Sequence, residues 1–399
     1  MRVLIADKLP DTTRTRLAGA GFEVRAEPSL KDDTLVEALQ SFDPHILVVR
    51  STKVREDHAS AGSSLSLVIR AGAGTNTIAV DRCSARAIFV ANCPGKNAVA
   101  VAELTLGLLL ALDRFIPDNV SDLRQGQWNK KAYSAGRGLR GRTLGIIGVG
   151  SIGEEVAMRA HAFGMRVIGW SRSLTPERAE ELGIEFHPTP ESVAANADAV
   201  SVHLAYKPET RELIGDSVFD AMRHGALFLN TSRAEVVNEA SLLRALEEKG
   251  IRAGLDVVSD EPSGKAGPFE HPLGAHPAVY VTHHIGASTD EAQEAVGDEV
   301  CRIAEAFRDE GRVLNVVNRI EETAATHRLD VRHHDRVGVL ARVLDCLSRA
   351  GLNVQEMENQ VFPGGAAIAR IQTSGEPPGE LRRELEAFDA VLHVSVVEL

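Results

Sequence analysis

Short apolar runs separated by amphipathic stretches and turns make up the chain from residue 1 to about residue 282, a pattern typical of parallel βα units. Near-continuous apolar runs of this length predict strands of a parallel sheet covered by helices on both faces. A helical stretch at 98–112 and a polar, glycine-rich connector at 125–142 separate the runs into two series. We therefore predict two doubly wound, Rossmann-like α/β domains. The expected strands are 3–6, 46–49, 67–71 and 88–91 in the first series, and 144–149, 167–170, 199–203, 226–230, 254–258 and 279–282 in the second.

The last part of the chain has a different pattern. A helix at 290–307 is followed by a linker at 315–326, and a separate block begins near residue 327. The order strand, helix, strand, strand, helix, strand in this block predicts a ferredoxin-like βαββαβ domain. The expected strands are 328–331, 353–362, 366–373 and 392–397, and the expected helices are 337–350 and 380–388.

The most hydrophobic run, 98–112, is shorter than the roughly 20 residues that a membrane-spanning helix needs, and it contains Glu103. We predict a helix buried inside protein and no contact with a membrane. No apolar stretch with a small-residue cleavage site opens the chain, and the 4 cysteines are scattered without a CxxC pair. These features predict a cytoplasmic protein without a disulfide framework and without a metal site.

Charge and composition narrow the class of partner. The 399 residues carry a formal net charge of -12, which argues against a surface built to bind nucleic acid or anionic lipid. The hydrophobic share of 44% and the charged share of 25% are ordinary for a globular chain. We therefore expect a folded protein with a small-molecule partner.

A glycine motif follows the expected strand at 144–149. Gly148, Gly150 and Gly153 have the GxGxxG spacing, and the motif opens a helix, which is the context of a dinucleotide-binding turn. Gly148 would permit the tight turn, Gly150 would let the pyrophosphate approach the backbone, and Gly153 would let helix and strand pack closely. A glycine-rich turn that binds nothing is the alternative reading, and the strand and helix around the motif disfavour it.

The acidic residue expected on the adenine ribose, about 20 residues after the motif, is missing. Ser171 and Arg172 stand there instead, and a guanidinium between hydroxyls suits the 2′-phosphate of NADP better than a bare diol. The alternative is that Arg172 stacks on the adenine while NAD binds.

Arg233, Glu261 and His284 each follow a strand of the second series, on the side where open α/β sheets bind ligands. Oxidising a secondary alcohol needs a base for the hydroxyl proton, and reducing the ketone needs the same group as an acid. His284 can do both, Glu261 would hold its ring in one tautomer, and Arg233 can clamp a substrate carboxylate. His283 competes with His284 for the role, and each residue alone could be structural.

Three segments resemble signature sequences of the D-2-hydroxyacid dehydrogenases: 230–233, 255–257 with Glu261-Pro262, and 284–289. The resemblance extends over nearly the whole chain and includes the segment 70–76. It implies a dehydrogenase that uses NAD, or NADP, on a small anionic 2-hydroxy or 2-oxo acid, with Arg233, Glu261 and His284 as the catalytic set. It also implies a substrate domain formed by 1–97 and 287–318, a nucleotide domain at 98–286, a linker at 319–326 and a regulatory domain at 327–399. The cofactor-binding residues expected are Gly148, Gly150, Ser151, Ile152, Gly153, Ser171, Arg172, Thr231 and Asp256.

By the same resemblance, several residues face the substrate side of the cleft, where the amides of a glycine loop can bind a carboxylate. They are Arg50, Ser51, Gly72, Gly74 and Asn97. A phosphorylated substrate needs further positive charge, which Arg50 would supply first. Lys130, beside an expected exposed Trp128, is a second source, although this segment could equally be a subunit contact. The helix at 98–112 matches the dimer-forming region of the family, so a homodimer or homotetramer is expected.

The C-terminal block resembles ACT domains, small modules that bind amino acids at their interfaces. The resemblance implies an amino-acid effector site at Asp335, Gly338 and Asn353. Asp335 and Val337 stand where asparagine and proline are typical, which puts serine as the effector in doubt. A pairing module without a ligand is the alternative.

Two other functions remain open at this stage. An NADPH-dependent reductase of glyoxylate or hydroxypyruvate is favoured by Ser171-Arg172, and the ACT-like block argues against it. A nucleotide-sensing, corepressor-like binding protein would keep the same fold, but such proteins end in a polar disordered tail, and here the tail is patterned.

Overall fold

The computed structural model describes residues 1–262, 267–320 and 322–399. The chain divides into two compact units, Met1–Asn318 and Arg319–Leu399. Residue 321, within the predicted linker, lies outside the described residues. Each unit has its own hydrophobic core, because four buried clusters lie wholly in the first unit and a fifth lies wholly in the second.

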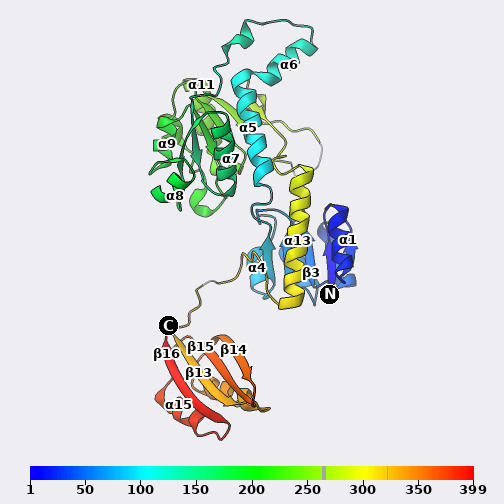
Figure 1. Cartoon of the computed structure of the whole chain (residues 1–399). Coiled ribbons are helices and arrows are strands. Elements are labelled where there is room, and N and C mark those ends of the chain that lie inside the picture. Colours follow the sequence, from blue (N-terminus) through cyan, green and yellow to red (C-terminus); the bar gives the residue numbers. More distant parts are fainter. Residues whose placement is uncertain (263–266, 321) are drawn as a thin grey trace. The chain divides into compact units, whose positions relative to one another are not determined.

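The first sheet of the N-terminal unit has five parallel strands in the order β2-β1-β3-β4-β5. Its strands are β1 (Arg2–Ile5), β2 (Glu23–Ala26), β3 (Ile46–Val49), β4 (Leu67–Arg70) and β5 (Phe89–Asn92). Its helices are α1 (Asp11–Gly19), α2 (Asp32–Phe42), α3 (Glu56–Ala61), α4 (Val80–Ser84) and α13 (Asp290–Glu310). Figure 1 labels its strand β3 and the helices α1, α4 and α13. Val300, Ile303 and Ala304 of α13 are buried in the same cluster as Val3 and Ile69, so a helix distant in sequence completes this layer.

The second sheet has seven parallel strands in the order β12-β11-β10-β9-β6-β7-β8. Its strands are β6 (Thr143–Ile147), β7 (Arg166–Trp170), β8 (Glu185–Phe186), β9 (Ala199–Val202), β10 (Leu227–Asn230), β11 (Arg252–Leu255) and β12 (Val279–Val281). Its α-helices are α5 (Ala98–Arg114), α6 (Ile116–Arg124), α7 (Ser151–Ala162), α8 (Pro176–Glu181), α9 (Pro190–Asn196), α10 (Asp216–Ala221), α11 (Glu239–Lys249) and α12 (Pro272–Ala275), and its 3-10 helices are η1 (Ala132–Ala135), η2 (Pro208–Thr210) and η3 (Ala234–Val236). The strands that follow β6 are added first on one side of it (β7, β8) and then on the other (β9 to β12). In sheets of this kind, ligands bind at the carboxyl ends of the strands where the strand order reverses in this way.

The parallel α/β architecture predicted from the apolar runs is confirmed. Two strands, β2 and β8, were not predicted. β2 is a partly exposed edge strand with the polar sequence Glu-Val-Arg-Ala, and β8 has only two residues, so neither forms an apolar run.

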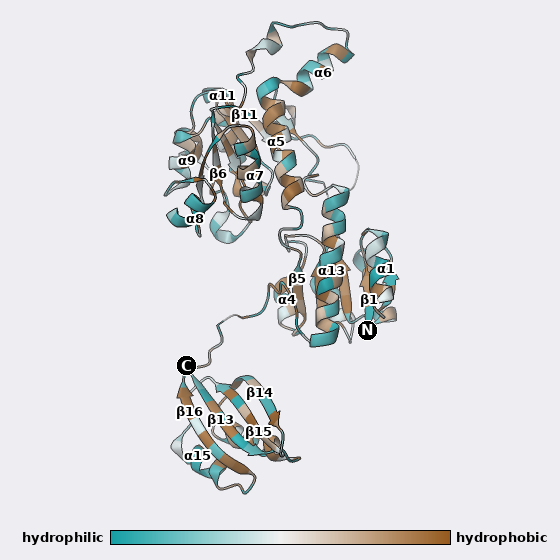
Figure 2. Cartoon of the chain, in the orientation of Figure 1, coloured by the Kyte–Doolittle hydropathy of each residue, from teal (hydrophilic) through white to brown (hydrophobic). Residues whose placement is uncertain are grey.

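The apolar helix predicted at 98–112 is α5, which runs on to Arg114 and ends at Phe115, where φ is 56°. Figure 2 shows its long hydrophobic stretch. Leu106, Leu109 and Leu112 are buried in one cluster with strand residues of the second sheet, so packing within the chain accounts for its apolar character. No helix in the described ranges has the length and hydropathy that crossing a bilayer requires.

The C-terminal unit is a four-stranded antiparallel sheet in the order β14-β15-β13-β16, as the predicted βαββαβ order requires. Its elements are β13 (His327–His334), α14 (Val339–Arg349), β14 (Val354–Phe362), β15 (Ala366–Thr373), α15 (Gly379–Glu386) and β16 (Val391–Glu398). Leu329, Val343, Ile371 and Leu385 are buried together, so the two helices cover one face of the sheet.

Candidate active site

The glycine loop after β6 has the geometry of a dinucleotide-binding turn. Gly148 has φ 105°, and a Cβ there would lie 2.5 Å from the carbonyl oxygen of His203. A Cβ at Gly153 would lie 2.5 Å from the carbonyl oxygen of Gly148, whereas a Cβ at Gly150 would meet nothing within 4 Å. The packing of the backbone therefore requires glycine at positions 148 and 153. The open space at Gly150 suits the close approach of a pyrophosphate. Ser151 opens α7, whose N-terminus faces this space.

The end of β7 carries hydroxyls and a guanidinium, as the sequence indicated. The hydroxyl of Ser171 is buried and has no hydrogen-bond partner in the described part of the chain. Arg172 and Ser173 are exposed beside it. A buried hydroxyl without a partner costs free energy, and a ligand that supplies the partner would recover it. These residues fit the adenosine end of a dinucleotide.

His284 and Glu261 form the pair predicted from the sequence. Nδ1 of His284 lies 2.7 Å from Oε2 of Glu261, and Oε1 of Glu261 accepts a hydrogen bond from the backbone N–H of Val258 at 3.2 Å. Partial burial raises the pKa of Glu261, but the hydrogen bond and charge of His284, together with the Val258 N–H and the charge of Arg233, outweigh it, so the pKa lies below its usual value. An ionised Glu261 orients the imidazole so that Nε2 is left for substrate.

Asp256, expected among the cofactor residues, has its carboxylate inside the loop that carries His284. It accepts hydrogen bonds from Thr282 Oγ1 at 2.5 Å, from Ile285 N–H at 2.9 Å and from Gly286 N–H at 2.8 Å. The backbone carbonyl of Asp256 accepts the N–H of His284 at 2.9 Å. His284 adopts a left-handed φ of 53°, and these four bonds hold it there. Asp256 is thus placed to support His284.

Thr231 is also buried and does not line the cleft. Its hydroxyl lies 2.8 Å from that of Thr105 on α5, so it joins α5 to the turn after β10. The resemblance predicts that Thr231 and Asp256 touch the cofactor, and this stays a prediction. In addition, the side chains of both residues bond to protein atoms.

Arg233 reaches across to the glycine loop of the first sheet. Its Nη1 donates to the carbonyl of Ser232 at 2.6 Å, and a Cβ at Gly74 would lie 2.4 Å from its Nη2. Gly72 has φ 147°, and a Cβ there would lie 1.7 Å from Nη1 of Arg70. The loop was expected to bind an anion through its amides, but its two glycines also make room for two guanidinium groups.

Arg70 is a site residue that the sequence reasoning did not single out. Burial, together with the positive charges of Arg233 and Arg50, lowers its pKa to about 10, and its Nε has no hydrogen-bond partner in the described ranges. A charged residue at the end of the apolar strand β4, directly before the glycine loop, was the available signal. Three guanidinium groups that repel one another favour a bound anion.

Arg50 is held in place by two residues that the sequence did not reveal. Oδ2 of Asp7 accepts the backbone N–H groups of Arg50, Ser51 and Thr52 at 2.6, 3.0 and 2.9 Å. Nη1 of Arg50 donates to Oε1 of Gln293 at 3.3 Å. Asp7 stands two residues after the end of β1, so a polar residue just past a buried strand was again the signal.

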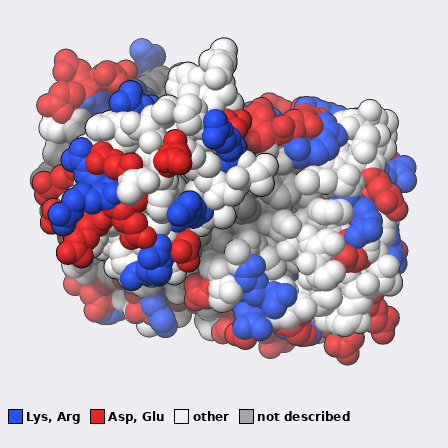
Figure 3. Space-filling model, turned by 90° about the horizontal axis from the view of Figure 1, so that it is seen from below, with Lys and Arg blue, Asp and Glu red and all other residues white. Residues whose placement is uncertain are grey.

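The cleft between the two sheets gathers these groups. It has a volume of about 1270 Å³ and is lined by residues at the carboxyl ends of strands in both sheets. Among the expected residues it contains Arg50, Ser51, Gly72, Asn97, Arg233, Glu261 and His284. Lys130, expected as a second phosphate-binding residue, is exposed and does not line this cleft. On the face shown in Figure 3, basic and acidic side chains are interspersed.

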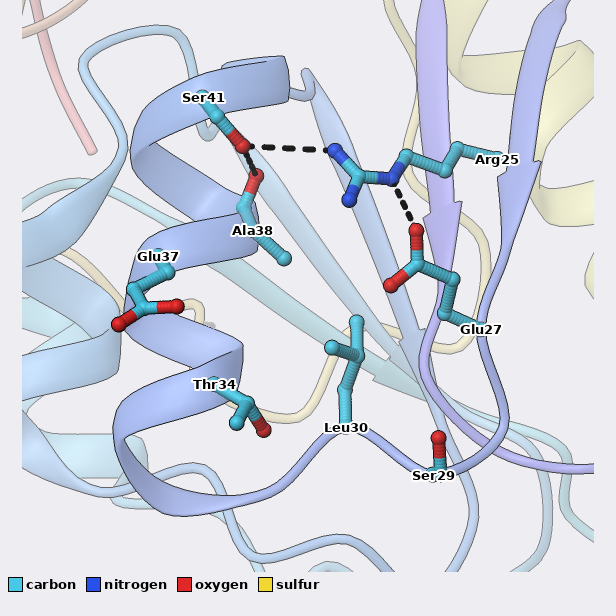
Figure 4. Close-up of a pocket in the computed structure, with 8 residues that line it drawn as sticks. All are labelled: Arg25, Glu27, Ser29, Leu30, Thr34, Glu37, Ala38 and Ser41. Atoms are coloured by element: carbon cyan, nitrogen blue, oxygen red, sulfur yellow. Dashed lines mark hydrogen bonds and ion pairs between the residues drawn. The ribbon is translucent and has the colours of Figure 1, made fainter.

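A smaller cavity of about 380 Å³ lies between β2 and α2 (Figure 4). Nε of Arg25 donates to Oε1 of Glu27 at 2.5 Å, and its Nη1 donates to Oγ of Ser41 at 3.4 Å. Arg25 thus bonds to two other polar residues of this cavity, Glu27 and Ser41.

The three expected effector residues do not come together within one C-terminal unit. Asp335 and Gly338 precede α14, and Gly338 is its N-cap with φ 90°. Asn353 follows the other end of this helix of 11 residues, about 16 Å away along its axis.

Comparison with known proteins agrees with this geometry. Residues 106–286 match a protein family described as "D-isomer specific 2-hydroxyacid dehydrogenase, NAD binding domain". The chain is 37% identical over 321 residues to a D-3-phosphoglycerate dehydrogenase of Methanocaldococcus jannaschii, covering 80% of this chain and 59% of that protein. It is 34% identical over 378 residues to the D-3-phosphoglycerate dehydrogenase of Rattus norvegicus, covering 94% of this chain and 68% of that protein.

A solved structure is similar as well. The NAD+-bound 3-phosphoglycerate dehydrogenase of Entamoeba histolytica superposes with a TM-score of 0.66 at 26% identity, covering 80% of this chain and 99% of that chain. The curated relatives are longer proteins, of which this chain spans 59% in one case and 68% in the other.

Proposed function

Because the chain belongs to the D-isomer-specific 2-hydroxyacid dehydrogenases, we propose that it oxidises 3-phospho-D-glycerate to 3-phosphooxypyruvate with NAD, the first step of the phosphorylated route to L-serine. The observation that carries this proposal is the cluster of Arg50, Arg70 and Arg233 beside the His284–Glu261 pair. A 2-hydroxy acid with a second anionic group can neutralise all three guanidinium groups, whereas a simple monocarboxylate cannot.

The residues divide the chemistry among them. Nε2 of His284 takes the proton of the C2 hydroxyl, and Glu261, hydrogen-bonded to Nδ1, stabilises the imidazolium that forms. Arg233 clamps the carboxylate and polarises the developing carbonyl, while Arg50 and Arg70 hold the distal phosphate. Bound NAD supplies the hydride acceptor. The glycine loop at Gly148 and the N-terminus of α7 would hold its pyrophosphate, and Ser171 its adenosine end.

The test is the initial rate of nicotinamide reduction with 3-phosphoglycerate at alkaline pH, with NAD and NADP in parallel. Turnover with NAD supports the proposal. Turnover with neither cofactor, together with tight nucleotide binding and no activity on a panel of 2-oxo acids, would indicate a nucleotide-sensing protein instead.

Ser171-Arg172 supports a second candidate, an NADPH-dependent reductase of glyoxylate or hydroxypyruvate. The buried, unpaired hydroxyl of Ser171 and the exposed guanidinium of Arg172 are both suited to a 2′-phosphate. Oxidation of NADPH by hydroxypyruvate, without turnover of 3-phosphoglycerate, would favour this candidate. The variant Arg172→Ala should then raise KM for NADPH and leave KM for NADH unchanged.

We also propose that the C-terminal βαββαβ unit is an ACT-like regulatory module and that the chain works as a homodimer or homotetramer. Asp335, Gly338 and Asn353 lie at opposite ends of α14, so an amino-acid site using all three would need residues from a second copy. Titration of the protein with L-serine and other amino acids by calorimetry, with light scattering for the assembly state, tests both statements.

A further inference from the structure

A second carboxylate lies behind the loop that carries Glu261. Glu239 is the first residue of α11, and its side chain is mostly buried. Its Oε1 accepts the backbone N–H of Ser259 at 2.7 Å, and its Oε2 accepts the Ser259 hydroxyl at 2.6 Å. One side chain thus binds both the backbone and the side chain of a single loop residue, which fixes the position of that residue.

His271 completes this network from the other side. Its Nδ1 accepts the backbone N–H of Leu273 at 3.3 Å, so the ring proton is placed on Nε2. Nε2 lies 3.3 Å from Oε2 of Glu239 and 3.1 Å from Oγ of Ser259. The ring is 8% exposed and stacks on Phe269 at a centroid distance of 5.7 Å. His271 therefore limits the movement of the Glu239 carboxylate.

The loop held by this network is short and strained. Ser259 stands two residues before Glu261, and Asp260 between them has a left-handed φ of 55°. The N–H of Val258, at the start of the loop, is bonded to the Glu261 carboxylate itself. A strained conformation persists only where its surroundings hold it. Among the described residues, the bonds from Ser259 to Glu239 and from Val258 to Glu261 hold this loop. The same loop carries Glu261, whose Oε2 lies 2.7 Å from Nδ1 of His284.

We infer that Glu239 is a positioning residue for the dehydrogenase reaction: through Ser259 it holds the loop at the place where Glu261 can orient His284, and His271 steadies its carboxylate. This inference rests on one part of the proposed function, namely that the His284–Glu261 pair transfers the proton. Glu239 acts through Glu261 and needs no contact with substrate.

The experiment compares four variants with the wild-type chain. Glu239→Gln presents an N–H₂ group to one of the two donors of Ser259, and Ser259→Ala removes the hydroxyl. Ser259→Thr keeps the hydroxyl and is the conservative rescue. Glu247→Gln is the matched control, since Glu247 lies exposed on the same helix.

We expect Glu239→Gln and Ser259→Ala to lower kcat about 10- to 100-fold, because small misplacements of catalytic groups have effects of that size. KM for the hydroxy acid and Kd for the nucleotide should change less than about twofold, because Arg233 and the glycine loop are untouched. The acidic limb of the pH profile for alcohol oxidation should move to lower pH, since a misplaced Glu261 supports the imidazolium less well. Ser259→Thr and Glu247→Gln should behave as the wild type.

Full turnover in Glu239→Gln would overturn the inference. So would equal losses in kcat, in nucleotide affinity and in Tm, because these would show a general folding defect.

A second measurement does not depend on turnover. Hydrogen exchange at the amide of Ser259 should be protected in the wild type and fast in Glu239→Gln, and equal exchange in the two proteins would also overturn the inference. If the proposed function is wrong, the wild-type chain will not oxidise 3-phosphoglycerate, and this result is separate from the behaviour of the variants. The turnover of the variants and of the wild type would then be measured with the 2-oxo acid that the wild type reduces.

Discussion

The guanidinium of Arg70 is buried beside those of Arg50 and Arg233, and its pKa falls to about 10 because of burial and this repulsion. A buried charge without a carboxylate partner destabilises the unliganded protein, and such groups persist where function requires them. Asp7, a carboxylate whose charge acts on Arg70, has Oδ2 occupied by three backbone N–H groups. The site therefore favours a bound anion, and none of the described residues supplies one to Arg70.

Replacing this arginine by a neutral residue of similar length tests that view. Arg70→Met should raise KM for the anionic substrate at least about tenfold, as the loss of a charge-assisted hydrogen bond implies. It should also raise Tm of the unliganded protein, because it removes a repelling charge. Steady-state kinetics measures KM, and scanning calorimetry without substrate measures Tm. A lower Tm with unchanged KM would show that Arg70 has a structural role.

His284→Ala tests the proton-transfer pair at the same scale. We expect kcat to fall by roughly 100-fold or more, because the variant removes the imidazole proposed to take the hydroxyl proton. Nucleotide affinity should be unchanged, since the glycine loop is separate from this residue. Steady-state kinetics and a fluorescence titration with the reduced nucleotide measure the two quantities. The neighbouring variant His283→Ala is the control, and a larger loss there would assign the role to His283.

At the scale of elements, the junction between β6 and α7 shows how three glycines serve different needs. A Cβ at Gly148 or at Gly153 would collide with backbone oxygens, whereas a Cβ at Gly150 points into open space. Gly148 and Gly153 are therefore needed for the turn to fold, and Gly150 leaves space for the pyrophosphate of a nucleotide to approach the backbone.

Gly150→Ala should keep the wild-type Tm within about 2 °C, because its Cβ meets no atom within 4 Å and its φ of -124° suits alanine. It should nevertheless weaken nucleotide binding by at least about tenfold, by blocking the approach to the backbone. Gly148→Ala should lower both stability and affinity. Thermal unfolding and nucleotide titration of the two variants separate these effects, and equal behaviour of the two would contradict this assignment.

Helix α13 is tied to the segment before α5 by a buried carboxylate. Glu299 is bonded to Arg302 at 2.5 Å and to Asn315 at 2.6 Å, and it pairs with Lys96 at 3.3 Å. The hydrogen bond from Arg302 is the largest cause that lowers the pKa of Glu299, from 4.5 to about 2. A carboxyl group with a depressed folded-state pKa stabilises the fold above its unfolded pKa.

This pKa difference predicts how stability depends on pH. The contribution of Glu299 is fully present above about pH 4.5 and is lost as the pH falls toward 2. Glu299→Gln should therefore lower the free energy of unfolding by on the order of 3 kcal/mol at pH 7 and flatten its dependence on pH between these values. Denaturant titrations at several pH values check this. Glu310→Gln, at an exposed pair on the same helix, should change stability by less than about 1 kcal/mol.

At the scale of the whole molecule, the two units have separate cores. Residues 315–318 complete the first unit: Val317 N–H donates to the carbonyl of Val90 at 2.8 Å, and Asn92 N–H donates to that of Asn315 at 3.3 Å. The chain after Asn318 makes up the second unit. The proposed catalytic groups all precede this point.

A chain cut after Asn318 should therefore fold and keep its turnover. We expect kcat and nucleotide affinity within about threefold of the full chain, and no response to any amino acid that affects the full chain. Circular dichroism and steady-state kinetics of the shortened protein check this. A fragment that folds but has no activity would show that the C-terminal unit contributes to the active site.

Local patterns in the sequence determined the strands, the turn at Gly148 and the expectation that Arg233, Glu261 and His284 share a cleft. Each depends on residues close in sequence or on the rule that strand ends meet at one edge of a sheet. The polar edge strand β2 lacked this local signal, since hydrogen bonds to β1 define it.

Only the tertiary structure decided the environment of each functional group. It placed Arg70 against Arg50 and Arg233, Asp7 under the Arg50 loop, and Glu239 behind Ser259, although these partners stand 20 or more residues apart in sequence. It also turned Asp256 toward the loop of His284 and left Lys130 outside the cleft. Burial, repulsion between charges and long-range hydrogen bonds arise only when distant strand ends are brought together, and no local pattern of residues encodes them.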